Sequence, residues 1–229
     1  MWKLLILYNI GMTHLEIAFL FVLSYVLGGI PTGYIIGKMN GVDIRTIGSG
    51  NPGTANVFRN FGLGAGLLTF LVDFMKGFLP TWIAVHFMFD PNNTEWFSRG
   101  HWWIPVTVGT LAIAGHIWTI FLNFKGGKGV ATSAGVFAAL LPLPLSLALA
   151  TFAVLVAITK YISVGSMGAS VVLPFFCYFL SEPYQKPFTI LACCVCVLIF
   201  CTHINNIRRI LRGEELTYRN PKTGEIEKK

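Results

Sequence analysis

The stretch Val130–Ile158, VATSAGVFAALLPLPLSLALATFAVLVAI, decides how many times this chain crosses a membrane. It is an uninterrupted apolar run, and it is longer than the roughly 20 residues that one helical span needs. Pro142 and Pro144 lie near its middle, where proline removes a helical hydrogen bond and clashes with the preceding turn. We therefore predict a break there, with two short helical segments at 130–141 and 145–158.

The composition of the whole chain places this stretch among other membrane segments. Of the 229 residues, 54% are hydrophobic and only 12% are charged, about half the charged share of a typical soluble domain. The mean hydropathy is +0.66. The other long apolar runs are 15–37, 63–89, 103–124, 164–180 and 188–205. The sequence thus predicts an all-α, polytopic membrane helix bundle that forms a single domain over residues 1–229.

The distribution of positive charge favours seven segments over six. Lys and Arg concentrate in the cytoplasmic loops of membrane proteins. With seven segments, the tail 206–229 lies on the same side as three lysine- and arginine-bearing loops, namely 38–60, 125–129 and 159–163. With six, Lys160 and the arginine-rich tail would lie on the opposite side. We therefore predict seven transmembrane segments, with the N-terminus outside and the C-terminus cytoplasmic.

Two glycine-rich loops lie on that predicted cytoplasmic face. Gly48–Arg59 reads GSGNPGTANVFR, and Phe124–Thr132 reads FKGGKGVAT. Glycine lets the backbone approach a ligand closely, and free N–H groups at the start of a following helix bind anions. Arg59 adds a bidentate fork for phosphate oxygens, and Lys128 adds a point charge. Either loop alone is typical of a mobile turn, but two of them on one face favour a phosphate pocket.

Neither loop matches a nucleotide-binding motif in its proper setting. GSGNPG at 48–53 has the dinucleotide pattern, but a membrane helix precedes it where that fold needs a strand. The second loop has Leu122 where a Walker A loop requires glycine, and Gly129 where it requires Ser or Thr. The five cysteines have no zinc-finger spacing. We expect no cofactor, no metal site and no nucleic-acid partner.

Polar residues at two further helix ends are predicted to converge on the same face. Ser163 and Ser166 open the sixth segment within KYISVGS. Near the end of the chain, His203, Asn206 and Arg209 follow one another at a spacing that places them along one side of a helix. These residues extend the predicted phosphate pocket to the last segments of the bundle.

Three ionisable residues lie inside predicted spans. Asp73 and Lys76 form an i, i+3 pair, which we interpret as mutual neutralisation that supports the site. His116 lies in the third span, about two helical turns before the glycine-rich loop. For His116 a satisfied polar contact and a functional role remain equally open, since ionisable groups inside a membrane are functional candidates by default.

The ordered motifs GSGNPGTANVFR, VDFMKG, FKGGKGVAT, KYISVGS and HINNIRRILRGEE resemble one family. The chain is similar, over roughly residues 25–215, to the membrane-integral acyl-phosphate:glycerol-3-phosphate acyltransferase of bacterial phospholipid synthesis. The resemblance implies seven membrane segments, location in the bacterial cell (inner) membrane and a site facing the cytoplasm. The implied reaction moves a fatty acyl group from acyl phosphate to the sn-1 hydroxyl of glycerol 3-phosphate, giving lysophosphatidic acid and phosphate.

The loops and the resemblance together give the expected site. The expected catalytic residues are His203, Asn206, Ser49 and Lys128. The expected binding residues are Gly50, Asn51, Gly53, Asn56, Arg59, Lys125, Gly126, Gly127, Gly129, Ser163, Ser166 and Arg209. The expected supporting residues are Asp73, Lys76 and His116. His203 is expected to orient the attacking hydroxyl or take its proton, with a substrate phosphate as the alternative base.

The chain departs from the family pattern in three places. The pair Thr54-Ala55 has its order exchanged, Thr119 replaces a common proline, and Thr202 stands where a basic residue is usual. Of these changes only Thr202 removes a charge.

The implied partners are acyl phosphate and glycerol 3-phosphate as substrates, membrane lipid, and the soluble enzyme that makes acyl phosphate. The competing function is a membrane transporter of phosphate or a small organic anion, because transporters also aim the ends of broken helices at anions. The chain shows no internal repeat between its halves, which favours the enzyme.

Overall fold

The computed structural model describes residues 13–86, 102–181 and 185–218. The regular structure of these residues is helical, as predicted. The helices are α2 (His14–Gly29), α3 (Thr32–Met39), α4 (Thr54–His86), α6 (Trp103–Ile117), α7 (Val130–Leu140), α8 (Pro142–Thr159), α9 (Ile162–Leu180), α10 (Gln185–Thr202) and α11 (Ile204–Leu211). Two short 3₁₀ turns are η1 (Ile44–Thr46) and η2 (Ile120–Leu122).

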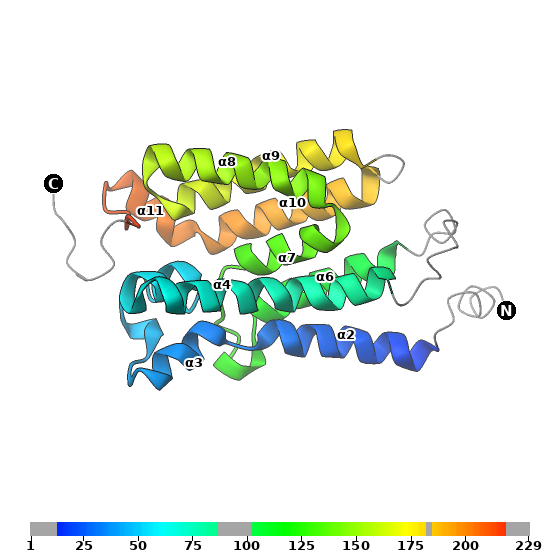
Figure 1. The fold of residues 1–229 in the computed structure, drawn as a ribbon, viewed down its shortest axis with the longest axis horizontal. Coiled ribbons are helices and arrows are strands. Elements are labelled where there is room, and N and C mark those ends of the chain that lie inside the picture. The colour runs from blue at the N-terminus through cyan, green and yellow to red at the C-terminus, as the bar shows by residue number, and fades with distance from the viewer. Residues whose placement is uncertain (1–12, 87–101, 182–184, 219–229) are drawn as a thin grey trace.

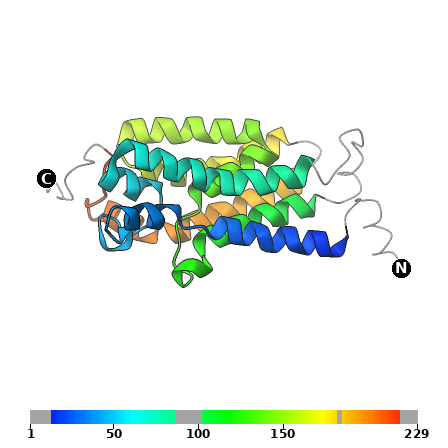
Figure 2. The ribbon, with the colours of Figure 1, turned by 60° about the horizontal axis from the view of Figure 1, so that its bottom comes forward.

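The long helices lie side by side along the long axis of the molecule, and α7 lies among them (Figure 1). Helix α4 packs against α6 and α7, α2 packs against α6, and α9 packs against both α8 and α10. The start of α2 and the last helix, α11, lie at opposite ends of the bundle. The segment around η2, between α6 and α7, projects from the side of the bundle (Figure 2).

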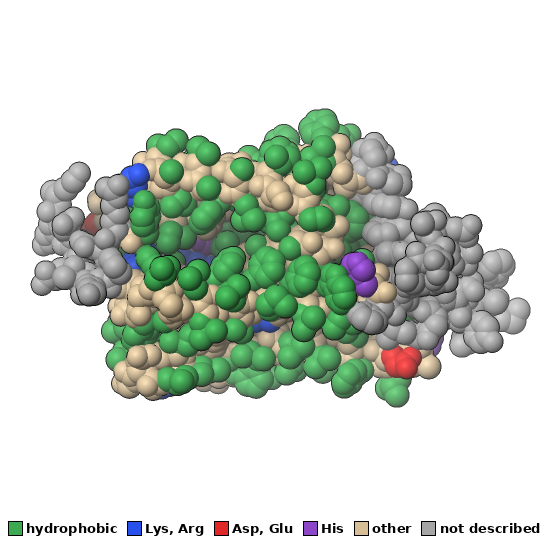
Figure 3. All heavy atoms as spheres, in the orientation of Figure 1, with side chains coloured by type: hydrophobic (Ala, Val, Ile, Leu, Met, Phe, Trp, Pro, Cys, Tyr) green, Lys and Arg blue, Asp and Glu red, His purple; other side chains and the backbone are tan. Residues whose placement is uncertain are grey.

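The exterior of the bundle is apolar, as a lipid environment requires. Within the described residues, five helical stretches are long and apolar enough to cross a membrane, and a sixth is added if α10 and α11 count as one bent span. Hydrophobic side chains cover most of the face seen in Figure 3. Many of them are large and exposed, including Phe19, Leu63 and Phe175. Surfaces of this kind suit lipid tails, not water.

The run that opened the sequence analysis is broken, as predicted, but the boundary differs. Helix α7 ends at Leu140 and α8 begins at Pro142, three residues earlier than predicted. Proline is accepted in the first turn of a helix, where its missing N–H would have no partner in any case. Helix α7 has 11 residues and therefore rises only about 16 Å, too little for a full crossing. The predicted count of seven transmembrane segments thus stays a prediction.

The predicted span 15–37 matches one apolar stretch, His14–Met39, which contains a break, and two other predicted boundaries were wrong. The first span breaks between α2 and α3, because Pro31 has no N–H and disfavours a helical residue before it. Helix α4 begins at Thr54 instead of 63, so half of the first glycine-rich loop is helical, with a kink at Gly62, whose φ is +86°. The last segment bends by 57° between α10 and α11. His203 therefore precedes α11 instead of continuing one straight helical face with Asn206.

Candidate functional site

A cavity of about 540 Å³ lies between α4, α7, α8, α9 and α10. At the end of the bundle that holds α11, its walls carry polar groups, among them Arg59, Lys128 and Asn206. Farther along α4 and α8 the lining becomes apolar, with residues such as Leu67 and Leu149. The cavity therefore has a cationic end and a hydrophobic end, which suits an amphiphilic anion with a long chain.

A chain of hydrogen bonds organises the cationic end. Lys128 Nζ donates to Asn206 Oδ1, and Asn206 Nδ2 donates to Glu215 Oε1 over 2.6 Å. The same carboxylate accepts from Ser163 Oγ at 2.7 Å and from Arg209 Nε at 2.8 Å. Glu215 is buried, so this single negative charge holds three polar side chains directly, and it holds Lys128 through Asn206. The arrangement orients the amide oxygen of Asn206 toward Lys128.

His203 has a defined tautomer in this arrangement. Its Nδ1 lies 2.8 Å from the carbonyl oxygen of Ile199. A carbonyl oxygen only accepts hydrogen bonds, so the ring proton sits on Nδ1 and Nε2 is left as an acceptor. The side chain is buried and lines the cavity. His203 can therefore accept a proton or a hydrogen bond through Nε2.

The first glycine-rich loop is held by one buried amide. Asn56 accepts from Ser49 N at 2.9 Å, and its Nδ2 donates to the carbonyl oxygens of Ile44 and Ile47 at 3.1 and 3.0 Å. The side chain is 1% exposed. Asn56 was predicted to bind substrate, but the protein itself uses its polar atoms. Its place in the site is to shape the loop that carries Ser49 into the cavity lining.

Arg59 lies one turn beyond Asn56 and also lines the cavity. Its Nε is buried and has no hydrogen-bond partner among the described residues. An unpaired buried guanidinium nitrogen is costly unless a ligand satisfies it. Arg59 therefore has a free donor available for an anion in the cavity.

Two N–H groups of the second glycine-rich loop are not available for the backbone cradle that its sequence predicted. Gly126 N donates to the carbonyl oxygen of Ile117 at 2.9 Å, and Gly127 N donates to that of His116 at 3.0 Å. These N–H groups cap the end of α6 and are not available to a ligand. Lys125 is exposed and, like both glycines, lies outside the lining of the large cavity. From this loop, Lys128 and Gly129 reach the cavity wall, together with the first turn of α7.

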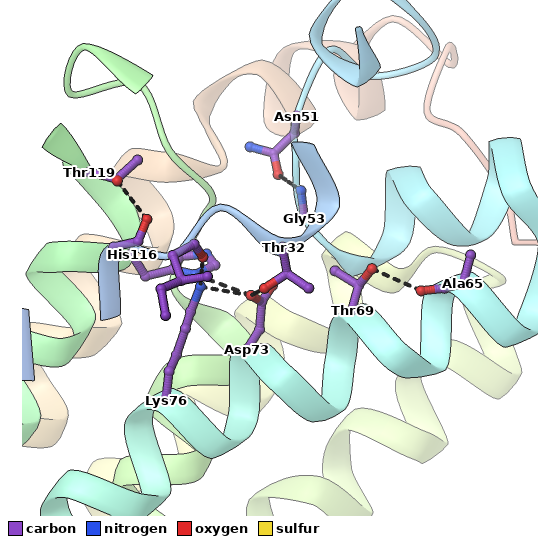
Figure 4. A network of polar contacts seen from close by, with 11 residues as sticks. Thr32, Asn51, Gly53, Ala65, Thr69, Asp73, Lys76, His116 and Thr119 are labelled. Atoms are coloured by element: carbon purple, nitrogen blue, oxygen red, sulfur yellow. Dashed lines mark hydrogen bonds and ion pairs between the residues drawn. The ribbon is translucent and has the colours of Figure 1, made fainter. Parts of the chain in front are cut away.

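The predicted ion pair of Asp73 with Lys76 is present, with 2.7 Å between Oδ1 and Nζ. Thr32 Oγ1 donates to the same carboxylate oxygen at 3.2 Å, and His116 Nδ1 lies 3.9 Å from it (Figure 4). Both charged side chains are buried. This cluster lies beside the second loop, and Asp73 and His116 also line the large cavity.

Lys128 has an unusual protonation equilibrium for a lysine. Burial, helped by the positive charges of Arg209 and Arg59 and opposed by Glu215, lowers the pKa of its ammonium to about 8. A negatively charged ligand beside Lys128 would favour the protonated form of its amine, so this lysine is suited to bind an anion.

The structure brings most of the predicted site residues to one cavity. The predicted residues that line it are Ser49, Asn51, Gly53, Asn56, Arg59, Asp73, His116, Lys128, Gly129, Ser163, Ser166, His203 and Asn206. Those outside its lining are Gly50, Lys76, Lys125, Gly126, Gly127 and Arg209. Sequence reasoning missed Glu215 and Tyr218. Glu215 is the last residue of the motif HINNIRRILRGEE. An acidic residue at the end of a motif rich in arginine could have indicated an ion pair within the site.

The sequence model of the family described as glycerol-3-phosphate acyltransferase matches residues 18–213. The chain belongs to the glycerol-3-phosphate acyltransferase family. One relative of that name, from Endomicrobium trichonymphae, is 42% identical over 85% of this chain and 92% of its own length. Another, from Geobacter sulfurreducens, is 41% identical over 84% of this chain and 92% of its own.

Solved structures agree with this assignment. The crystal structure of PlsY, an integral membrane glycerol 3-phosphate acyltransferase, in its glycerol 3-phosphate form is 34% identical. The match covers 88% of this chain and 95% of the PlsY chain, with a TM-score of 0.78. The lysophosphatidic acid form is 33% identical, covers 90% of this chain and 96% of that chain, and has a TM-score of 0.76. This chain is therefore an integral-membrane member of an acyltransferase family of phospholipid biosynthesis.

Proposed function

We propose that this protein transfers a fatty acyl group from acyl phosphate to the sn-1 hydroxyl of glycerol 3-phosphate. The products are lysophosphatidic acid and inorganic phosphate. The observation that carries the proposal is the cavity with Arg59, Lys128 and His203 at one end and an apolar lining at the other. Two phosphate groups and one acyl chain fit that distribution. Family membership favours acyl transfer over the transporter that the sequence left open.

In the proposed reaction the hydroxyl oxygen attacks the acyl carbonyl carbon. The bond between that carbon and the phosphate oxygen breaks, and the phosphate leaves with the electron pair. Acyl phosphate carries a good leaving group, so the protein mainly has to position both substrates and stabilise charge. His203 Nε2 takes the hydroxyl proton, and a substrate phosphate is the alternative acceptor. No covalent acyl-serine is required.

The remaining side chains have binding roles in this proposal. Arg59 offers its free Nε to a phosphate oxygen, and Lys128 adds a positive charge. Asn206 keeps Lys128 in the cavity, and Ser49 and Ser166 line the space where phosphate and carbonyl oxygens would lie. The apolar walls of α4 and α8 take the fatty chain.

We further propose a single domain with seven membrane crossings, its N-terminus outside and the cationic end of the cavity at the cytoplasmic face of the bacterial inner membrane. The soluble enzyme that makes acyl phosphate would then meet the protein on that face. Single cysteines placed at Lys38, Lys160 and Lys186, in a background without native cysteines, test the topology. We expect the first two to react with an impermeant reagent only in inside-out vesicles. The seven-crossing topology puts Lys186 outside, so the same pattern at Lys186, reaction only in inside-out vesicles, would disprove it.

The donor is tested with purified protein in detergent. Synthetic acyl phosphate and labelled glycerol 3-phosphate should give labelled lysophosphatidic acid without nucleotide, coenzyme A or added metal. Equal rates with acyl-coenzyme A, or loss of activity with a chelator, would contradict the proposed donor. Movement of labelled solute into vesicles without product would support the transporter instead.

A further inference from the structure

The ends of two helices and one turn lie close together inside the bundle. Helix α2 ends at Gly29 just before Pro31, α6 ends at Ile117, and the turn before α7 passes the same point. The end of α6 is tied to the end of α2, because Thr119 Oγ1 donates to the carbonyl oxygen of Gly29 at 2.6 Å. Figure 4 shows these segments around the polar cluster that α4 contributes.

Side chains of α4 hold the broken end of α2. Lys76 Nζ donates to the carbonyl oxygen of Ile30 at 2.9 Å and pairs with Asp73 at 2.7 Å. Thr32, at the start of α3, donates to Asp73 as well. Lys76 is 7% exposed and Asp73 is 2% exposed. A buried ion pair of this kind is expensive to break, because removal of one partner leaves the other charge uncompensated.

The imidazole of His116 lies between this ion pair and the second glycine-rich loop. On one side its Nδ1 is 3.9 Å from Asp73 Oδ1. On the other side it touches the backbone so closely that a Cβ added at Gly127 would overlap Nε2 and lie 2.7 Å from Cε1. The carbonyl oxygen of the same histidine accepts from Gly127 N at 3.0 Å. The imidazole ring and the carbonyl oxygen of His116 together fix the position of the turn relative to the end of α6.

We propose that His116, backed by Asp73 and Lys76, is a positioning residue that places the turn Gly126–Lys128 and thereby the Lys128 ammonium in the cavity. Lys128 directly follows the glycine that rests on the imidazole, and its Nζ reaches Asn206. The inference rests on the proposed acyl transfer, in which Lys128 binds a phosphate. It assigns Gly127 a packing role against His116 and no direct contact with a ligand.

The first test is a pair of substitutions that compensate each other. Gly127→Ala introduces a methyl group into the space of the imidazole, and we expect a loss of about 10- to 100-fold in kcat/KM, since misplacement by about 1 Å can cost 100-fold. His116→Ala removes the ring. The double variant should recover at least part of the activity that Gly127→Ala loses. If the double variant is no better than Gly127→Ala alone, the glycine does not act through His116 and the proposal is overturned.

The second test asks whether His116 acts through Lys128. His116→Ala and His116→Gln should raise the KM for a phosphate substrate more than they lower kcat. In a Lys128→Ala background the same changes should add little, because the positioned group is already absent. Fully additive losses, or an effect on melting temperature alone, would mean a merely structural histidine. Gly64→Ala is the matched control, since a Cβ there meets nothing within 4 Å. Wild-type turnover in the same assay checks the proposed function independently.

Discussion

The two glycine-rich loops look alike in sequence and differ in what their glycines do. In the first loop, Gly48 and Gly50 have φ angles of +56° and +70°, which side-chain-bearing residues rarely adopt. In the second loop, Gly126 and Gly127 have no positive φ, but a Cβ at either would overlap the end of α6. Gly48 and Gly50 of the first loop are therefore needed for backbone conformation, and Gly126 and Gly127 of the second for close packing, while Gly129 in the second loop has a φ of +83°.

The loops also differ in what holds them. A side chain, Asn56, binds the first loop through three backbone groups. Main-chain carbonyls of His116 and Ile117 bind the second. In both, some backbone N–H groups are already used by the protein, among them those of Ser49, Gly126 and Gly127, so these groups are not free to hold an anion. The first loop contributes the free donor of Arg59 to the cavity, and the second loop contributes the charge of Lys128.

The largest effect is expected from the two cations themselves. Arg59→Ala and Lys128→Ala each remove one charge-assisted contact from a partly dry site, a loss of about 2–4 kcal/mol in transition-state binding, or roughly 30- to 1000-fold in kcat/KM. Initial rates against both substrates measure this, with thermal melting in detergent as the check on folding. Rates near wild type for both variants would show that phosphate is bound by other groups.

A smaller loss is expected when the first loop loses its holding side chain. Asn56→Ala leaves Ser49 N and the carbonyl oxygen of Ile44 without partners, while that of Ile47 still accepts from Gly50 N. Each buried group left unpaired costs about 1–3 kcal/mol unless water replaces the amide. We expect a lower melting temperature together with a higher KM, because Ser49 moves. Asn60→Ala is the control from the same helix, since Asn60 donates to Asn56, while the bonds to the backbone of Ile44, Ile47 and Ser49 come from Asn56 itself. Equal behaviour of the two variants would contradict the role given to Asn56.

The membrane class and most site residues could be predicted from the sequence, for identifiable reasons. The length of the apolar runs and the uneven distribution of Lys and Arg can be read directly from the sequence. The helix bundle and the break in the run at Pro142 could therefore be predicted. Lys128, Asn206 and His203 lie in motifs of fixed spacing, and the structure brings them to one cavity. The pairing of Asp73 with Lys76 followed from the i, i+3 geometry of a helix.

What could not be predicted depends on contacts between distant segments. Nothing local in FKGGKG says that its glycine N–H groups are taken by α6 carbonyls. The carboxylate of Glu215 reaches Ser163, 52 positions away in the sequence, only because the chain turns back after α11. Thr202, where the family pattern has a basic residue, donates to the carbonyl oxygen of Lys128 at 3.2 Å, a contact that depends on the fold.

A moderate, pH-dependent effect separates Lys128 from a merely structural lysine. The protonated ammonium binds phosphate, and its pKa is lowered to about 8. In the free enzyme kcat/KM should therefore be constant between about pH 7 and that pH and fall by up to about tenfold per unit above it. Glycerol 3-phosphate contributes no change there, because a phosphate monoester has its second pKa near 6.

Lys128→Arg provides the matching control for this profile. A guanidinium remains charged throughout this range, so the fall above pH 8 should disappear even if the maximal rate is lower. Donor decay without enzyme has to be measured at each pH and subtracted. A wild-type profile that stays flat to pH 9.5, or an unchanged fall in Lys128→Arg, would exclude Lys128 as the titrating group.

The smallest effect is expected at Lys125, three residues before Lys128 in the same loop. Both lysines were predicted to bind substrate, but Lys125 is exposed and lies outside the lining of the cavity, while Lys128 reaches Asn206 inside it. Exposed charges interact weakly across water and are screened by salt. Lys125→Ala should therefore keep kcat/KM within about twofold of wild type in detergent. Rates in vesicles should be compared with and without anionic lipid, because a basic residue near a membrane surface also attracts anionic headgroups. A drop that appears only with anionic vesicles would make Lys125 a headgroup contact. A drop in detergent that matches Lys128→Ala would place a phosphate outside the cavity, and the contrast drawn between the two loops would fail.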